Sequence, residues 1–258
     1  MDDPEDLSPT LELVGDWTSA RLLVRLLVVI DSPWELSAAG LTHRDTGETC
    51  ELQMRPRDAS MIEVFRAGEC PVRPSLSDEV MEGIAGHHSI LTVSASPDLR
   101  GWEAARTVLR CGSALVDSGA LAVRCLQSGL AHAGDRLSTL ERMAGAAGDD
   151  RALLGESLYL AYVMPLVRDG ASPRTRGMAL LEAPDAVVVG SVAEPNALDA
   201  MESLCLRTLA ARAPTSGEVV HASPHSPPFR VERMPDRTDP GSRGYNPFGL
   251  WRLEPVSR

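Results

Sequence analysis

The clearest pattern of apolar and polar positions lies in the middle of the chain. Ser89–Ser94 and Ala120–Leu126 are apolar runs of strand length. Between them, apolar and small residues recur every three or four positions, which is the spacing of one helical face; they are Trp102, Ala105, Leu109, Gly112 and Val116. Ser96-Pro97-Asp98 is typical of a helix start, and Gly119 of a helix end. We therefore predict a β-α-β unit, whose crossover is right-handed if its strands are parallel.

Other apolar runs also predict strands, because they are short and rich in Leu, Val and Ile. These runs are Ala20–Ile30, Met61–Phe65, Leu158–Val167, Gly177–Leu181, Ala186–Val189, Val219–Ala222, Phe229–Arg233 and Leu250–Leu253. Leu41–His43 and Thr49–Met54 flank a polar turn in which Gly47 can adopt a positive φ. A hairpin is therefore expected at this turn.

Three further segments carry helix signals. Ser75–Asp78 resembles a capping box and precedes apolar positions that end at Gly86. Asp135 is placed to cap a second helix, and Pro195-Asn196 begins a third with a continuous apolar face. This irregular succession of strands and helices predicts an α+β fold, with a mixed sheet of about six to nine strands and helices packed mainly on one face.

The same patterns suggest how the chain is organised. Residues 1–10 read as an acidic tail, and residues 11–258 as a single α+β domain. From residue 213 onward the chain is rich in Pro, Gly, Ser and Arg, so residues 213–258 are expected to form a loop-rich C-terminal lobe. Long loops in a compact domain are typical of binding segments or of mobile segments.

Charge and composition narrow the classes of function. The formal charge is −11, and all 25 basic residues are arginine, a usage typical of GC-rich bacterial genomes. Without lysine the chain has no Schiff-base lysine and no Walker-type phosphate lysine. The negative charge argues against nucleic-acid binding, which requires a basic face, and instead suits a basic protein partner or simply keeps the protein soluble.

Targeting and redox signals point to the cytoplasm. The first residues are acidic, whereas a signal peptide begins with basic residues. The longest apolar run, Leu22–Ile30, contains Arg25 and is too short to span a bilayer, so no membrane association is expected. Five cysteines occur without a CxxC pair, which predicts neither a zinc site nor a disulfide framework. No cofactor is expected, and the oligomeric state is left open.

Several short segments resemble an uncharacterised bacterial family of the domain-of-unknown-function type. The segments are His88–Val93, Gly119–Gly129, Thr175–Met178, Ala183–Asp185 and Asn246–Leu253. They consist mostly of small and apolar residues and carry no catalytic chemistry. Because that family has no assigned activity, the resemblance implies an α+β fold and nothing further.

The first candidate site is the loop from Ser128 to His132, which follows a predicted strand and precedes a predicted helix. Ligands often bind at such strand ends, where helix N-termini present free N–H groups. Ser128 could bind an anion and His132 could act as an acid or base near neutral pH. The alternative is a loop serine and a histidine that only serve the fold.

A second candidate is His88, which follows His87 directly. Adjacent residues on an extended strand point to opposite faces, so the simplest interpretation is one buried and one solvated imidazole. If His88 and His132 met across neighbouring strands, a carboxylate such as Asp117 or Glu141 would still be needed to complete a metal site.

Two more candidates involve arginines and aromatic residues. Arg174 and Arg176 alternate on one predicted strand, so they share a face and could clamp an anion; the alternative is a charged sheet edge. Tyr245 and Trp251, near His221 and His225, would suit a protein-binding anchor. Trp251 could equally complete the hydrophobic core.

No known catalytic signature occurs: GxSxG, HExxH, GxGxxG and GxxxxGK[ST] are all missing. The leading hypothesis is therefore a non-catalytic binding protein, such as an acidic adaptor or an immunity-type partner of a basic protein. The alternative is an enzyme that handles an anion or small molecule with His132, Ser128 and Arg176. Whether the chain is an enzyme is undecided at this point.

Overall fold

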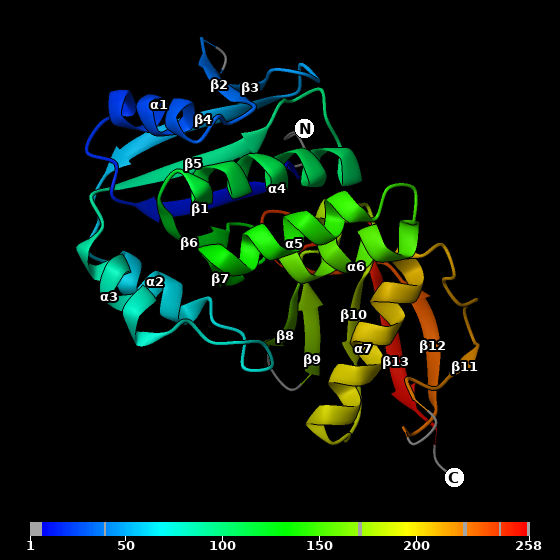
Figure 1. The fold of residues 1–258 in the computed structure, drawn as a ribbon. Helices are drawn as coiled ribbons and strands as arrows, with labels where there is room; N and C mark the ends of the chain where they lie inside the picture. Colours follow the sequence, from blue (N-terminus) through cyan, green and yellow to red (C-terminus); the bar gives the residue numbers. More distant parts are fainter. Residues whose placement is uncertain (1–6, 39, 170–171, 224–225, 243, 257–258) are drawn as a thin grey trace. The chain divides into compact units, whose positions relative to one another are not determined.

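The computed structural model describes residues 7–38, 40–169, 172–223, 226–242 and 244–256. It has the predicted α+β architecture, with helices and strands intermixed along the chain (Figure 1). The strands form two sheets instead of the single sheet expected. The chain divides into two compact units: residues 8–146 form the N-terminal unit, and residues 147–258 most of the C-terminal unit. The division thus lies at residue 146, whereas the sequence suggested a lobe beginning near residue 213.

A seven-stranded antiparallel sheet forms the centre of the N-terminal unit, with the strand order β2-β3-β4-β5-β1-β6-β7. Its strands are β1 (Thr10–Gly15), β2 (Trp34–Ser37), β3 (Gly40–His43), β4 (Thr49–Pro56), β5 (Ser89–Ala95), β6 (Ala120–Cys125) and β7 (Ala131–Ala133). Strands β5 and β6 both run antiparallel to β1 and are therefore parallel to each other. The β-α-β unit and the β3–β4 hairpin are confirmed.

Helices cover both faces of this sheet. They are α1 (Ala20–Val29), α2 (Met61–Ala67), α3 (Asp78–Gly86), α4 (Gly101–Asp117) and α5 (Gly134–Ala146). On one face, α4 packs closely on β1, because a Cβ added to Gly112 would lie 2.8 Å from the Leu11 side chain and 3.1 Å from Leu137 of α5. The short helices α2 and α3 pack against the other face.

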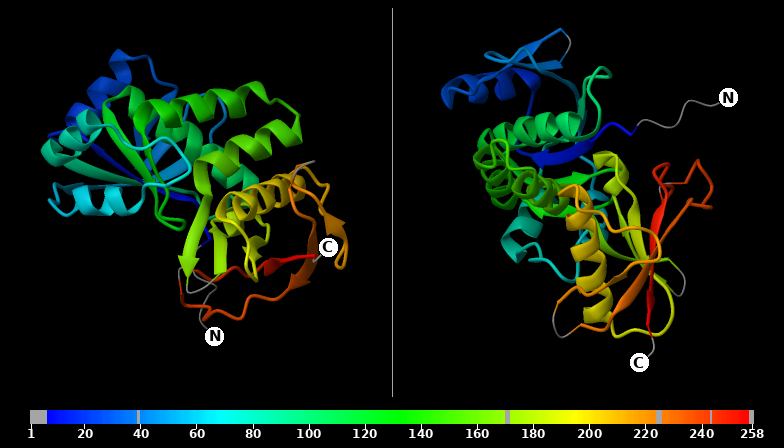
Figure 2. Two further views of the ribbon diagram at one scale, coloured as in Figure 1. Left: turned by 90° about the horizontal axis from the view of Figure 1, so that it is seen from below. Right: turned by 90° about the vertical axis from the view of Figure 1, so that its right-hand side faces the viewer.

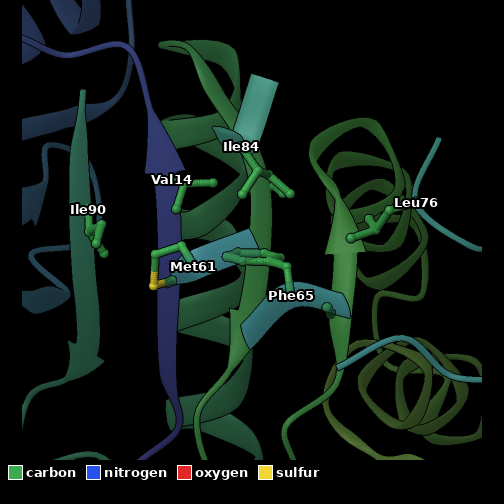
Figure 3. Close-up of a cluster of buried hydrophobic side chains, with 8 residues drawn as sticks. Val14, Met61, Phe65, Leu76, Ile84 and Ile90 are labelled. Atoms are coloured by element: carbon green, nitrogen blue, oxygen red, sulfur yellow. The ribbon is translucent and has the colours of Figure 1, made fainter. Parts of the chain in front are cut away.

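Figure 3 shows the core beneath α2 and α3. Met61 and Phe65 of α2 and Ile84 of α3 pack with Val14 of β1 and Ile90 of β5. The prediction of a strand at residues 61–65 is therefore wrong. The residues buried there are four positions apart, which is the spacing of a helix and not of a strand.

The prediction of a central strand at residues 20–30 is also wrong, because this segment is α1. Ser19 caps the helix by accepting a hydrogen bond from the Leu22 N–H. Leu23 and Leu27, four residues apart, are its buried residues. The expected tail is also partly wrong: Ser8 and Pro9 are buried, and Thr10 begins β1, an interior strand that lies between β5 and β6. Residues 1–6 of the expected tail lie outside the described residues.

The C-terminal unit contains a six-stranded mixed sheet with the order β11-β12-β13-β10-β9-β8. Only the pair β10–β13 is parallel among its described neighbours. Its elements are α6 (Arg151–Tyr162), β8 (Met164–Asp169), β9 (Ser172–Arg176), the 3-10 helix η1 (Met178–Leu181), β10 (Asp185–Val188), α7 (Glu194–Leu209), β11 (Val219–Val220), β12 (Phe229–Met234) and β13 (Leu250–Pro255). Figure 2 gives two further views of these strands and of α7.

In this unit the strand predicted at Gly177–Leu181 is wrong, and the strand predicted at Leu158–Val167 is confirmed only for residues 164–167, which belong to β8. Residues 158–162 belong to α6, which starts where the Asp150 carboxylate accepts hydrogen bonds from the N–H groups of Ala152 and Leu153. Residues 178–181 form η1 after Gly177, whose φ of 118° interrupts the extended backbone. The predictions of β10, α7, β12 and β13 are confirmed. Among the described residues, none of the helices combines the length and the apolar character that crossing a membrane requires.

Candidate functional site

The loop after β6 is held by hydrogen bonds between its own residues. Ser128 is buried, and its hydroxyl accepts a hydrogen bond from the Leu130 N–H at 3.2 Å. His132 lies on β7 opposite Val123 and is also buried. Both side chains therefore belong to the interior of the N-terminal unit, and a ligand in solvent reaches neither in this conformation.

The two neighbouring histidines have different environments, as their geometry predicts. His87 is buried, and its Nδ1 lies 2.5 Å from the Ile84 carbonyl oxygen, while its Nε2 accepts the Asp58 N–H at 3.3 Å. His88 is exposed, and its Nδ1 lies 3.5 Å from an Asp16 carboxylate oxygen. The structure thus gives His87 a role in the fold and leaves His88 at the surface.

His88 and His132 do not meet. His88 precedes β5, and His132 lies on β7, which is the third strand away in the sheet. Because neighbouring strands are about 4.8 Å apart, the two residues are separated by roughly 14 Å across the sheet alone. One metal ion cannot bind both imidazoles, since zinc–nitrogen bonds are only about 2 Å long. Across the described part of the chain, no group of three His, Cys, Asp or Glu residues is arranged to hold a metal ion.

Arg174 and Arg176 share one face of β9, as predicted, and both approach the loop between β12 and β13. A Cβ added to Gly244 would lie 3.7 Å from an Arg174 Nη atom and 3.9 Å from Arg176 Nη2. Arg174 is buried; it donates a hydrogen bond to the Gly244 carbonyl and lies 3.8 Å from an Asp236 carboxylate oxygen. Its charge is thus directed at the loop and not at solvent.

Asn246 fixes the same loop to the sheet. Its side-chain amide donates hydrogen bonds to an Asp185 carboxylate oxygen at 2.7 Å and to the Ala183 carbonyl at 3.0 Å. Its backbone N–H donates to Asp236 at 2.9 Å, and its side-chain oxygen accepts the Phe248 N–H at 2.9 Å. One buried residue therefore joins β10 to both ends of the loop.

Asp185 is the buried carboxylate at the centre of this network. Besides Asn246, the Thr175 hydroxyl donates to it at 2.9 Å and the Met178 N–H at 3.3 Å. Burial raises the pKa of Asp185 above its usual value of 3.8, while the hydrogen bonds from Asn246 and Thr175 and the charge of Arg174 act in the opposite direction. Each carboxylate oxygen thus has at least one donor inside the protein.

Cys205 of α7 lies beside this carboxylate, with its Sγ 4.0 Å from the Thr175 hydroxyl. Burial, followed by the nearby Asp185 charge, raises the pKa of the Cys205 thiol far above its usual value. A thiol held in its protonated form is a poor nucleophile. The cluster therefore provides a scaffold for the loop instead of reactive groups.

The two aromatic candidates differ in exposure. Trp251 lies on β13 and is buried, with the Arg233 guanidinium 5.3 Å from its ring centre, so it belongs to the core. Tyr245 is partly exposed in the loop. His221 is exposed, and His225 lies outside the described residues.

A groove of about 700 Å³ lies in the C-terminal unit, between α6, α7 and the chain after β11. Its lining residues on α7 recur at helical spacing and form one stripe, which the C-cap residue Ala210 continues: Asp199, Glu202, Ser203, Leu206 and Arg207. Leu153 and Glu156 line it from α6, next to the capping residue Asp150. The Arg151 guanidinium donates to the Leu209 carbonyl at 2.8 Å and so ties the start of α6 to the end of α7.

Carboxylates dominate the charge of this groove. Four carboxylates line it, namely Asp150, Glu156, Asp199 and Glu202, against the two guanidinium groups of Arg207 and Arg212. Arg207 also pairs with Glu218, outside the groove lining, at 3.4 Å. The half-buried Leu153 and Leu206 add apolar surface between the charges. The groove can thus accept a ligand with positive charges and an apolar side.

The sequence did not indicate this groove, although one of the two sets of residues that line it can be recognised in the sequence. The polar stripe of α7 has the same spacing as the apolar stripe that identified the helix. The facing residues of α6, at 152–156, were not assigned to any element from the sequence. Asp185 and Asn246 both belong to the resemblance motifs, but nothing in a single sequence shows that they meet.

No family model, no curated protein and no solved structure matches this chain. The resemblance to an uncharacterised bacterial family therefore stays a prediction. Function has to be argued from the residues themselves.

Proposed function

We propose that this chain is a non-catalytic binding protein that recognises a basic segment of a partner protein through the groove between α6 and α7. The observation that carries the proposal is that four carboxylates and two half-buried leucines line one groove of about 700 Å³. A basic amphipathic segment offers both kinds of complement, because arginine and lysine pair with carboxylates and apolar residues pack on leucine.

The charge of the groove also favours protein over nucleic acid as the partner. Carboxylates outnumber guanidinium groups two to one in the lining, so the groove repels phosphates. The formal charge of −11 also favours a basic partner while the two proteins approach each other, since an acidic surface attracts basic partners before contact.

The enzyme alternative has less support. Ser128 and His132 are both buried, and the Ser128 hydroxyl accepts a hydrogen bond from the Leu130 N–H. The Asp185 network uses its donors and acceptors to hold a loop, and the Cys205 thiol beside it is protonated. No observation on the described residues favours a particular reaction.

The test compares a groove variant with a matched control. Asp199→Asn combined with Glu202→Gln removes two groove charges at constant shape, while Glu79→Gln combined with Glu82→Gln removes two exposed charges from α3. Each protein is used at low ionic strength to capture partners from the native host, and captured proteins are identified by mass spectrometry. We expect the wild type and the control, but not the groove variant, to retain the same basic protein.

Titration of the purified partner then measures how much affinity the groove variant loses. Because an exposed ion pair contributes about 0.2–1 kcal/mol, the loss of two should weaken binding roughly fivefold, with the difference shrinking in high salt. Equal binding by all three proteins, or a captured partner without a basic surface, would refute the proposal.

A further inference from the structure

The charges that line the acidic groove are ordered along α7, and the proposed function does not use this order. The carboxylates of Asp199 and Glu202 line the groove in the middle of the helix, whereas Arg207 lies in its last turn and Arg212 two residues beyond its C-cap. Asp199 and Arg207 are eight residues apart, or about 12 Å along a helix. A ligand that lies along α7 therefore meets carboxylates toward one end of the groove and guanidinium groups toward the other.

The charges without a partner inside the protein follow the same order. Arg207 is engaged, because it pairs with Glu218 at 3.4 Å. In the part of the chain that the structure describes, no guanidinium pairs with Asp199 or Glu202, and no carboxylate pairs with the exposed Arg212. A ligand thus finds unpaired carboxylates at one end of the groove and an unpaired guanidinium at the other.

Asp150 does not reverse this order, although it lies near the arginine end of the groove. The Arg151 guanidinium donates to the Leu209 carbonyl, which places the start of α6 beside the end of α7. The Asp150 carboxylate is engaged there as the cap of α6, since it accepts hydrogen bonds from the N–H groups of Ala152 and Leu153. What this end offers to a ligand is therefore the unpaired guanidinium.

The dipole of α7 does not explain why these carboxylates are there. Carboxylates stabilise a helix through its dipole only when they lie near the first turn, which in α7 contains Glu194. Asp199 and Glu202 follow five and eight residues later. The dipole accounts for Arg207, which lies in the last turn, but for neither groove carboxylate. Their position therefore suits a ligand and not the stability of the helix.

We propose that the basic segment bound in this groove is an amphipathic helix that lies antiparallel to α7; this inference rests on the proposed function. A carboxylate in its first turn pairs with Arg212, and cations further along pair with Asp199 and Glu202. Its apolar side packs on Leu153 and Leu206. Because its own dipole favours anions at the start of a helix and cations at the end, the antiparallel direction satisfies both the dipole and the groove.

The groove fixes the length of helix that it can hold. From Asp199 to Ala210 the lining of α7 extends over eleven residues, or about 16 Å, which is three helical turns. A cylinder of this length and about 10 Å in diameter has a volume near ~1,200 Å³, which exceeds the groove volume of about 700 Å³. The groove therefore receives one side of the helix and leaves the other side in solvent.

Two synthetic peptides test the pairing with Arg212. Both are amphipathic, about four turns long, and carry arginines in their last two turns. One has a glutamate in its first turn, and the other has glutamine there. The glutamine peptide is the more positive, so general attraction to an acidic protein predicts that it binds more tightly. We expect the opposite: the full chain should bind the glutamate peptide about threefold more tightly at low salt, and this difference should vanish in Arg212→Gln.

Controls separate this inference from the proposed function. Arg237→Gln, at an exposed arginine outside the groove lining, should preserve the preference for glutamate. Asp199→Asn combined with Glu202→Gln should weaken both peptides, and circular dichroism should show that the bound peptide gains helix.

Three results overturn the helical, charge-ordered ligand while the basic-segment function stands: equal or tighter binding of the glutamine peptide, a preference that survives Arg212→Gln, or a bound peptide that gains no helix. If neither peptide binds the wild type, the inference and the proposed function are both overturned.

Discussion

At the scale of single residues, buried polar groups are used to hold one loop in place. The loop between β12 and β13 contains no regular secondary structure among its described residues. Its order depends on Asn246, whose side chain bonds Asp185, the Ala183 carbonyl and the Phe248 N–H. Buried donors and acceptors are costly when left without partners, so each of these bonds matters more than an exposed one.

Asn246→Ala should lower the free energy of unfolding by about 1–3 kcal/mol, because it leaves the Asp185 carboxylate and the Ala183 carbonyl without their amide donor. Urea unfolding measures this difference. The control is Arg237→Ala, at an exposed position in the same loop, for which a change within about 0.5 kcal/mol is expected. Equal effects of the two substitutions would show that Asn246 does not anchor the loop.

At the scale of elements, α1 shows that amino-acid composition can favour a strand in a segment whose buried positions are those of a helix. Seven of its ten residues are Leu or Val, and a short run of such residues favours a strand. The Ser19 cap and the burial of Leu23 and Leu27 make it a helix with one covered side. Of the other apolar residues of α1, Val28 and Val29 are exposed, whereas Leu22, Val24 and Leu26 are half-buried.

The helical assignment makes a specific prediction about neighbouring positions. Leu27→Ala should cost about 2–4 kcal/mol of unfolding free energy, since Leu27 is buried, whereas Val29→Ala should change it by less than about 0.5 kcal/mol. Both are measured by urea unfolding. On a strand, residues two apart share a face, so similar costs at the two positions would contradict the helix.

At the scale of the whole molecule, each unit has its own sheet and its own packed helices. The network around Asp185 and the acidic groove both lie within the C-terminal unit. The proposed binding of a basic segment is therefore assigned to the C-terminal unit.

Residues 8–146 expressed alone should fold, because the complete seven-stranded sheet and the helices on both of its faces lie within this segment. The expected result is a cooperative thermal transition by circular dichroism. A shorter segment, residues 8–118, lacks β6 and β7 and leaves β1 without one of its neighbours, so it should not fold cooperatively. An unstructured 8–146 segment would mean that the units depend on each other for stability.

Local sequence signals were sufficient to predict an element wherever its own residues identify it. Gly47 predicted the β3–β4 hairpin, and the spacing from Trp102 to Val116 predicted α4 between two strands. The alternation of Arg174 and Arg176 correctly placed both arginines on one face of β9. These features depend on backbone geometry over a few residues, which a sequence records directly.

The sequence by itself thus determined the α+β class, the acidic character and most elements with clear caps or periodicity. Only the tertiary structure decided whether the apolar runs at residues 20–30, 61–65 and 158–162 become helices or strands, because that choice depends on which side chains find a core. It also decided that Arg174, Asp185 and Asn246 meet, since they come from distant positions in the chain. The acidic groove likewise exists only because packing brings the polar stripe of α7 beside α6.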